Sequence, residues 1–147
     1  MNKMAVFVDI GDLYVKVNRG RKMNYGALLD YIRDLGNMGI VRAYGYKSTK
    51  KFDKFAAKLQ KIGYETIYDE TIGCVGLRQS VRIAMDALSM IDDYDILVLV
   101  TSDPSIAPLA EAIRAMGKQV IFVGVNLPPL FAGKADAALE LPREVLM

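Results

Sequence analysis

Aspartates and hydroxyl side chains follow two apolar runs of the 147-residue chain. The run AVFV leads into Asp9 and Asp12, and the run ILVLV leads into Thr101, Ser102 and Asp103. Converging carboxylates repel one another unless a cation lies between them, and oxygen ligands suit Mg²⁺ or Mn²⁺. Such an ion orients water and stabilises the transition state of phosphodiester hydrolysis. If the two segments meet, they predict a site for metal-dependent phosphoryl chemistry.

The residues that are rare or missing exclude other chemistries. The chain has no histidine, which excludes Ser-His-Asp triads, Cys-His nucleophiles and the commonest zinc sites. Cys74 is the single cysteine, so no disulfide forms within the chain and a cytoplasmic location is expected. No apolar stretch approaches the ~20 residues of a membrane span, and no signal-peptide pattern is present.

The aspartates that follow the strands also have structural interpretations. Asp103 precedes Pro104, a pattern typical of a residue that caps a helix. Asp12 suits a turn as well as it suits a metal ion. Asp9 is harder to explain in this way, because its charge would stand at the edge of the core.

A fourth candidate, Asp86, lies within a predicted helix. It follows Arg82 by four residues, so an ion pair on the helix surface explains it without a metal. The metal-ligand interpretation and the ion-pair interpretation both remain open from the sequence.

Alternating strand and helix patterns predict how these residues are positioned. They indicate one α/β domain over residues 1–147, a three-layer sandwich with a mainly parallel sheet of five to six strands. The third strand is the least apolar and is expected at an edge. Strands are predicted at 4–8, 40–46, 64–68, 96–100, 120–123 and 137–141, and helices at 25–35, 52–62, 79–91 and 106–116.

The predicted sheet gives the acids a place to meet. In parallel sheets, ligands bind beyond the carboxyl ends of the strands, at the point where the strand order reverses. If strands 4–8 and 96–100 are neighbours there, Asp9, Asp12 and Asp103 converge, and Thr101 and Ser102 support them by hydrogen bonding.

Basic residues are concentrated in the first half of the chain. Residues 1–62 contain 13 Lys and Arg against 5 Asp and Glu, whereas residues 63–147 contain 6 against 12. A basic strip that leads to an acidic site suits a nucleic-acid backbone, although a solvated helix face gives the same pattern. The candidate nucleic-acid-binding residues are Arg19, Arg21, Lys22, Lys47, Lys50, Lys51, Lys54 and Lys58.

Three segments in register resemble the NYN domain, a branch of the PIN-like nuclease superfamily. FVDIGDLY is similar to the opening D-x-x-N-L-[YF] pattern, with Asp12 in place of asparagine. LRQSVRIAMDAL is similar to a helix that carries an aspartate, here Asp86, and TSDPSIAPL is similar to S-G-D-x-D-F followed by x-P-L. KADAALEL resembles the closing segment, with Asp136. The resemblance implies a Rossmann-like, metal-dependent ribonuclease fold in which Asp9, Asp86 and Asp103 bind metal.

The chain departs from the family pattern within these motifs. Ser80 and Ser105 stand where the family has acids, and Leu77 stands where it has lysine. The remaining acids suffice for one Mg²⁺ whose other positions are filled by water. Arg82 either helps to bind phosphate or neutralises Asp86.

Three hypotheses of function follow. The first is an RNA endonuclease that depends on Mg²⁺ or Mn²⁺, with Asp9 and Asp103 as ligands and with Asp12 and Asp86 binding the ion or its waters. The second is a catalytically silent PIN-like module that binds RNA or a protein partner. The third is a homodimeric scaffold, suggested by eight methionines and abundant apolar residues.

Overall fold

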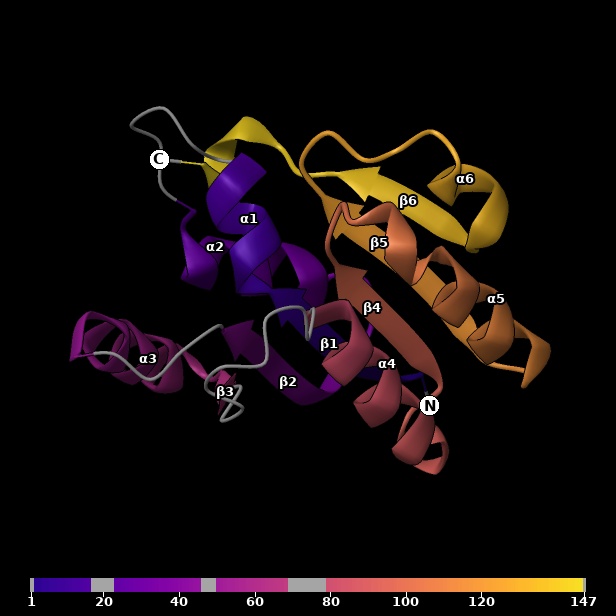
Figure 1. Ribbon diagram of the computed structural model, residues 1–147, viewed down its shortest axis with the longest axis horizontal. Helices are drawn as coiled ribbons and strands as arrows, with labels where there is room; N and C mark the ends of the chain where they lie inside the picture. Colours follow the sequence, from indigo (N-terminus) through magenta and orange to yellow (C-terminus); the bar gives the residue numbers. More distant parts are fainter. Residues whose placement is uncertain (1, 17–22, 46–49, 69–78, 147) are drawn as a thin grey trace.

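A parallel β-sheet forms the centre of the molecule in the computed structural model, which describes residues 2–16, 23–45, 50–68 and 79–146 (Figure 1). In this part of the chain, six strands pair in the order β3-β2-β1-β4-β5-β6, and every pair is parallel. The order reverses between β1 and β4. The strands are β1 (Lys3–Asp9), β2 (Asn37–Gly45), β3 (Glu65–Tyr68), β4 (Ile96–Val100), β5 (Gln119–Gly124) and β6 (Ala137–Glu140).

Helices cover both faces of this sheet. Buried residues of α1, α2 and α3 pack in one core cluster, and those of α4, α5 and α6 pack in a second cluster on the opposite face. The three-layer α/β prediction is therefore confirmed. The α-helices are α1 (Ile10–Lys16), α2 (Tyr25–Arg33), α3 (Lys50–Ile62), α4 (Gln79–Ser89), α5 (Ala107–Ala115) and α6 (Phe131–Lys134), with 3₁₀ turns η1 (Ile91–Asp93), η2 (Pro104–Ile106) and η3 (Arg143–Val145).

The two central strands are apolar because both of their faces are covered. All five residues of β4 are buried. Along β1, Val6 and Val8 point into the α1–α3 layer, whereas Ala5 and Phe7 point into the α4–α6 layer. Asp9 continues this alternation at the end of β1, so its side chain belongs to the α4–α6 face.

Two short helices were not predicted. The helix α1 begins directly after Asp9, and its seven residues include Gly11, so the helical period hardly shows in the sequence. The helix α6 follows Pro129, and its four residues are too few to show a helical period. The third strand lies at the edge of the sheet, as expected. Among the described residues, no helix has the length and apolar character needed to cross a membrane.

Candidate functional site

The two acidic segments meet where the strand order reverses. Strands β1 and β4 are hydrogen-bonded neighbours, and Val8 is paired with Val100. Asp9 and Thr101 follow this pair at the same carboxyl edge of the sheet. The strands that carry Asp9 and Asp103 are therefore neighbours, as the sequence predicted.

Asp9 is the most buried of the candidate acids. Asp9 is the last residue of β1 and is 4% exposed. Its two carboxylate oxygens accept hydrogen bonds from the Asp12 N–H and the Thr101 hydroxyl, each at 3.2 Å. Burial is the main reason that its pKa is raised to about 6. The nearby charges of Asp12 and Asp103 also raise this pKa, while the two hydrogen bonds lower it. A bound cation would relieve the same electrostatic cost.

Asp12 is fixed by Ser102. It lies in the first turn of α1, and one carboxylate oxygen accepts the Ser102 N–H at 2.7 Å and the Ser102 hydroxyl at 2.8 Å. The Thr101 hydroxyl accepts a hydrogen bond from the Asp103 N–H at 3.2 Å, in addition to its contact with Asp9. The hydroxyl groups of Thr101 and Ser102 therefore connect the end of β4 to Asp9 and Asp12.

Asp103 caps η2. Its Oδ1 accepts the Ser105 N–H at 3.0 Å, and Pro104 is the first residue of the turn. The capping interpretation is thus observed, and it uses only Oδ1. Among the described residues, Oδ2 receives no hydrogen bond. The charge of Asp103 contributes to the raised pKa of Asp9, which indicates that the two carboxylates lie near each other.

Asp86 has partners of its own among the described residues, and its binding of the same metal as Asp9 and Asp103 stays a prediction. Its Oδ2 accepts the Tyr44 hydroxyl at 2.8 Å and contacts the guanidinium groups of Arg42 and Arg82, each at 3.3 Å. The side chain is 16% exposed. Two arginines already neutralise this carboxylate, and this removes the electrostatic reason for a cation.

Sequence reasoning did not anticipate that Arg42 and Tyr44, which come from β2, bind Asp86. A signal was present, because a charged residue inside a predicted strand needs a partner of opposite charge. Asp86 on the helix that crosses the same face was available as that partner.

Ser80 and Ser105, which stand where the family pattern has acids, lie together. The Ser105 hydroxyl donates a hydrogen bond to the Ser80 hydroxyl at 3.3 Å, and Ser80 is 8% exposed. Ser105 also contacts Asp103, so both serines belong to the acidic site. A pair of neutral hydroxyls therefore occupies the position where two further carboxylates would lie.

The donors at this edge fit a hydrated ion better than an all-protein cage. In the described ranges, no group of three or more Asp, Glu, Cys or His side chains has an arrangement that could hold a metal ion. Mg²⁺, however, is commonly held by one or two carboxylates together with water and a substrate phosphate. Asp9 and its neighbours Asp12 and Asp103 supply hard oxygen donors of that kind.

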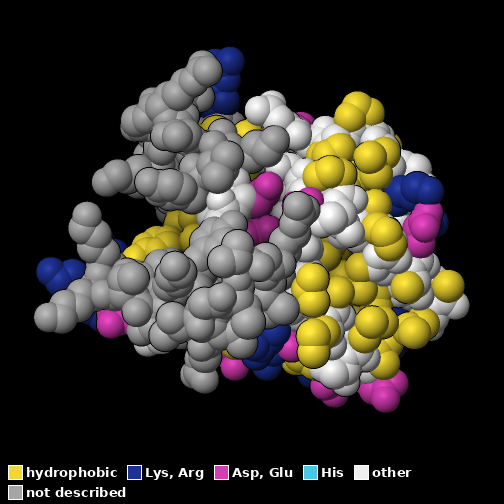
Figure 2. Space-filling model, in the orientation of Figure 1, with side chains coloured by type: hydrophobic (Ala, Val, Ile, Leu, Met, Phe, Trp, Pro, Cys, Tyr) yellow, Lys and Arg dark blue, Asp and Glu magenta, His cyan; other side chains and the backbone are white. Residues whose placement is uncertain are grey.

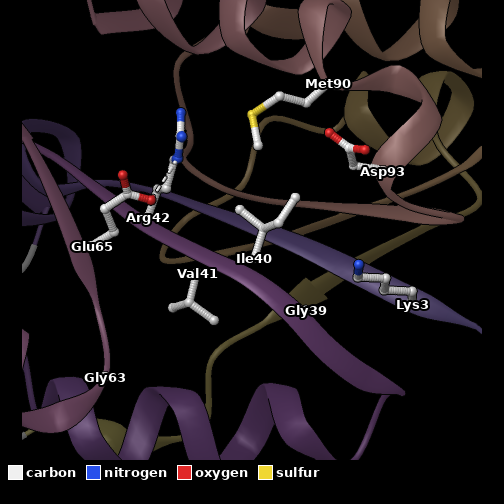
Figure 3. A pocket seen from close by; sticks show the side chains of 9 residues that line it. All are labelled: Lys3, Gly39, Ile40, Val41, Arg42, Gly63, Glu65, Met90 and Asp93. Atoms are coloured by element: carbon white, nitrogen blue, oxygen red, sulfur yellow. Dashed lines mark hydrogen bonds and ion pairs between the residues drawn. The ribbon is translucent and has the colours of Figure 1, made fainter.

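Arg42 also lines an open cavity of about 520 Å³ beside α4 (Figure 3). Ile40 from β2 and Met90, which follows α4, are apolar residues that line it from different elements, and Arg42 pairs with Glu65 beside them. Lys3, the first residue of β1, lines the cavity, whereas Asp9 is the last residue of that strand. The cavity therefore opens toward the amino end of β1, away from the acids.

Part of the predicted nucleic-acid surface is described. Lys54 and Lys58 are exposed one turn apart on α3, which begins with Lys50 and Lys51. Tyr44 is buried and packs edge-on against Phe7, with ring centroids 5.5 Å apart, so its ring is not available for stacking with bases. The remaining predicted contacts lie outside the described residues: Arg19, Arg21, Lys22 and Lys47.

Comparison with known proteins finds a family model and solved structures that are similar to this chain. The model of the NYN domain family matches residues 3–141. A crystal structure of a protein of unknown function from Vibrio parahaemolyticus superposes with a TM-score of 0.83 and 22% sequence identity, covering 99% of this chain and 96% of that one. At that identity the similarity shows the fold alone. No curated protein matches the chain.

Proposed function

Because the chain belongs to the NYN domain family, a branch of the PIN-like nucleases, we propose that it is a metal-dependent nuclease that cleaves RNA at Asp9, Asp12 and Asp103. The observation that carries this proposal is Asp9. A carboxylate buried at the strand-order reversal, next to two further acids and with its pKa raised to about 6, is poorly placed for stability and well placed to bind a cation. Among the described residues, no ion pair neutralises it.

The residues divide into ligands and supports. Asp9 and Asp103 would hold one Mg²⁺ or Mn²⁺, and Asp12 would bind it directly or orient its waters. When bound, such an ion polarises a phosphodiester and activates water for its hydrolysis. Thr101 and Ser102 keep the carboxylates in place through the hydrogen bonds described above, so the site is preorganised before RNA arrives.

RNA would reach the acids along the lysines of α3. Lys54 and Lys58 are exposed and free to meet phosphates, and α3 begins shortly after β2 ends at the edge that carries the acids. Binding through such phosphate contacts weakens as salt is raised. A cleavage rate that falls with salt at constant metal concentration is the expected signature.

The direct test is cleavage of single-stranded and structured RNA with Mg²⁺, with Mn²⁺ and with EDTA. We expect cleavage with either metal, none with EDTA, and none from Asp103→Asn with either metal. Asp92→Asn serves as the matched control, because Asp92 is an exposed acid on η1. Metal-dependent cleavage by Asp103→Asn at the wild-type rate would refute the assignment.

A second function, a silent module that binds RNA or protein, is favoured by a specific observation. The Ser80–Ser105 hydroxyl pair and the neutralised Asp86 leave three acids near the site. Calorimetric titration with Mn²⁺ separates the two functions. Saturable heat that disappears in Asp9→Asn supports the nuclease, and no heat at millimolar Mn²⁺ supports the silent module.

A further inference from the structure

The cavity of about 520 Å³ beside α4 lies at the opposite edge of the sheet from the acidic site. Lys3 begins β1 and lines the cavity, whereas Asp9 ends the same strand. At about 3.3 Å per residue, the two ends of β1 are about 20 Å apart. The cavity volume falls within the range of about 300–1,000 Å³ that small-molecule sites occupy. A small molecule bound here would therefore not contact the acids.

An irregularity in the sheet makes room for the Lys3 side chain at this cavity. The register between β1 and β2 shifts after Met4, so that Met4 is paired with Met38, Ala5 is paired with Ile40, and Gly39 is passed over. The Lys3 side chain lies across this glycine, because a Cβ at residue 39 would collide with its Cε and would lie 2.8 Å from its Cγ. Bulges of this kind redirect side chains and are common next to functional sites.

Two charged side chains of the cavity have no counter-ion among the described residues. Arg42 and Glu65 pair with each other, and Arg42 also contacts Asp86. Within the described ranges, no ion pair involves Lys3 or Asp93. In Figure 3, Lys3 and Asp93 lie on one side of the cavity and the Arg42–Glu65 pair lies on the other. One cation and one anion are therefore available to a ligand on the same side.

Apolar side chains lie between these two sides of the cavity. Ile40 and Met90 line it, and both are only partly buried against the core cluster of the α4–α6 layer. The apolar surface that the core leaves uncovered is available to an apolar group of a ligand.

The surroundings of Lys3 are acidic. Asp92 and Asp93 belong to η1, and the Asp95 carboxylate accepts the Lys3 backbone N–H at 2.9 Å. Figure 2 shows acidic side chains at the end of the molecule where α4 ends. These carboxylates repel a ligand that is only anionic, such as an RNA phosphate, whereas a ligand that carries its own cation is attracted to Asp93 while its anion meets Lys3.

We propose that this cavity binds a zwitterionic amino acid with a large apolar side chain. The ligand carboxylate binds the Lys3 ammonium, the ligand ammonium binds the Asp93 carboxylate, and the apolar side chain packs on Ile40 and Met90. Such a ligand is neutral overall, as are the two cations and two anions that line the cavity. The proposal does not rest on the nuclease function, because the cavity and the acids lie at opposite ends of β1.

Calorimetric titration of the full chain with L-phenylalanine and two analogues tests the ligand class. We expect saturable binding of L-phenylalanine. Phenylalaninamide lacks the carboxylate and N-acetylphenylalanine lacks the ammonium, so each should bind at least about tenfold more weakly. No saturable heat at millimolar L-phenylalanine, or equally tight binding of either analogue, overturns the proposal.

Two substitutions assign the charges. Lys3→Gln should weaken binding of L-phenylalanine about tenfold and leave phenylalaninamide unchanged, because that analogue has no carboxylate to pair with Lys3. Asp93→Asn should weaken L-phenylalanine similarly and leave N-acetylphenylalanine unchanged. Asp92→Asn is the matched control, since Asp92 is exposed on the same 3₁₀ turn and lies outside the cavity lining. Binding of L-phenylalanine that persists at wild-type strength in either cavity variant overturns the proposal.

Gly39→Ala tests how Lys3 is positioned. The added methyl group displaces the flexible Lys3 side chain, so this variant should fold and should bind L-phenylalanine about tenfold more weakly, as Lys3→Gln does. In a Lys3→Gln background, the same substitution should cause no further loss. Circular dichroism establishes that each variant is folded. Wild-type binding by folded Gly39→Ala contradicts the proposed role of Lys3. None of these measurements depends on RNA cleavage, so failure of the nuclease proposal leaves them intact.

Discussion

Asp9 and Asp86 lie on the same face of the sheet in opposite electrostatic situations. Tyr44 is paired with Asp9 in the sheet, and its hydroxyl donates a hydrogen bond to Asp86. Tyr44 is therefore next to both aspartates. Asp86 has two arginines, whereas Asp9 is surrounded by further acids and by hydroxyl groups. The presence of an aspartate therefore does not define a metal site in this fold. What distinguishes the candidate ligand is the absence of a compensating cation among the described residues.

The largest effect is expected from Asp9→Asn on catalysis. The amide has the shape of the carboxylate without its charge, so we expect metal-dependent RNA cleavage to fall by more than about 100-fold. Single-turnover assays at saturating Mg²⁺ and Mn²⁺ measure the loss. If Asp9→Asn cleaves at the wild-type rate while Asp86→Asn is inactive, Asp86 and not Asp9 is the metal ligand.

The next effect is a gain in stability from the same substitution. Asp9 holds its proton with a pKa of about 6 in the folded chain against an ordinary value of 3.8, so ionisation favours unfolding. The contribution of Asp9 to wild-type stability should therefore be greatest below about pH 4 and fall as pH rises to about 6. At pH 7, Asp9→Asn should be more stable by up to about 3 kcal/mol.

Urea unfolding at pH 4 and pH 7 measures this difference. We expect the wild-type free energy of unfolding to decrease between these pH values relative to that of Asp9→Asn. Added Mg²⁺ should restore part of the wild-type stability at pH 7 and leave the variant unchanged, because bound metal stabilises the folded state. A variant that is less stable than wild type at pH 7 would show that the Asp9 charge is already compensated.

The sequence predicted the fold well because buried strands and amphipathic helices leave periodic signals. The run at 96–100 is apolar at every position, and it forms the fully buried β4. The meeting of Asp9 with Asp103 followed from topology, since parallel strands bring their carboxyl ends to one edge. The helix α1 escaped prediction because seven residues with one glycine show little periodicity.

The environment of Asp86 could not be predicted in the same way. Its partner Arg42 lies 44 residues away on β2, and the contact depends on how α4 crosses the sheet. Local spacing showed only the nearby Arg82. The family pattern therefore suggested that Asp86 is a metal ligand, whereas the structure shows that it forms ion pairs with Arg42 and Arg82.

A smaller effect is expected from Asp86→Asn. Loss of the charge leaves Arg42 and Arg82 without their shared counter-ion, so the free energy of unfolding should fall by about 1–3 kcal/mol. Cleavage per folded molecule should be unchanged, because the substitution lies outside the acidic site. Urea unfolding and the RNA assay give the two values, with Asp92→Asn as the exposed control. If Asp86→Asn loses cleavage while its stability is unchanged, Asp86 takes part in metal binding.

The smallest effect is expected from Ser105→Asp, which adds a carboxylate beside Asp103. Ser105 is exposed and already contacts Asp103 through its N–H, so the new side chain enters the site without disturbing the core. We expect Mn²⁺ to bind about tenfold more tightly by calorimetry, because a carboxylate oxygen replaces a water ligand. Ser89→Asp is the control, since Ser89 is exposed at the far end of α4. Equal tightening by both substitutions would mean that general acidity, and not the site at the strand-order reversal, attracts the ion.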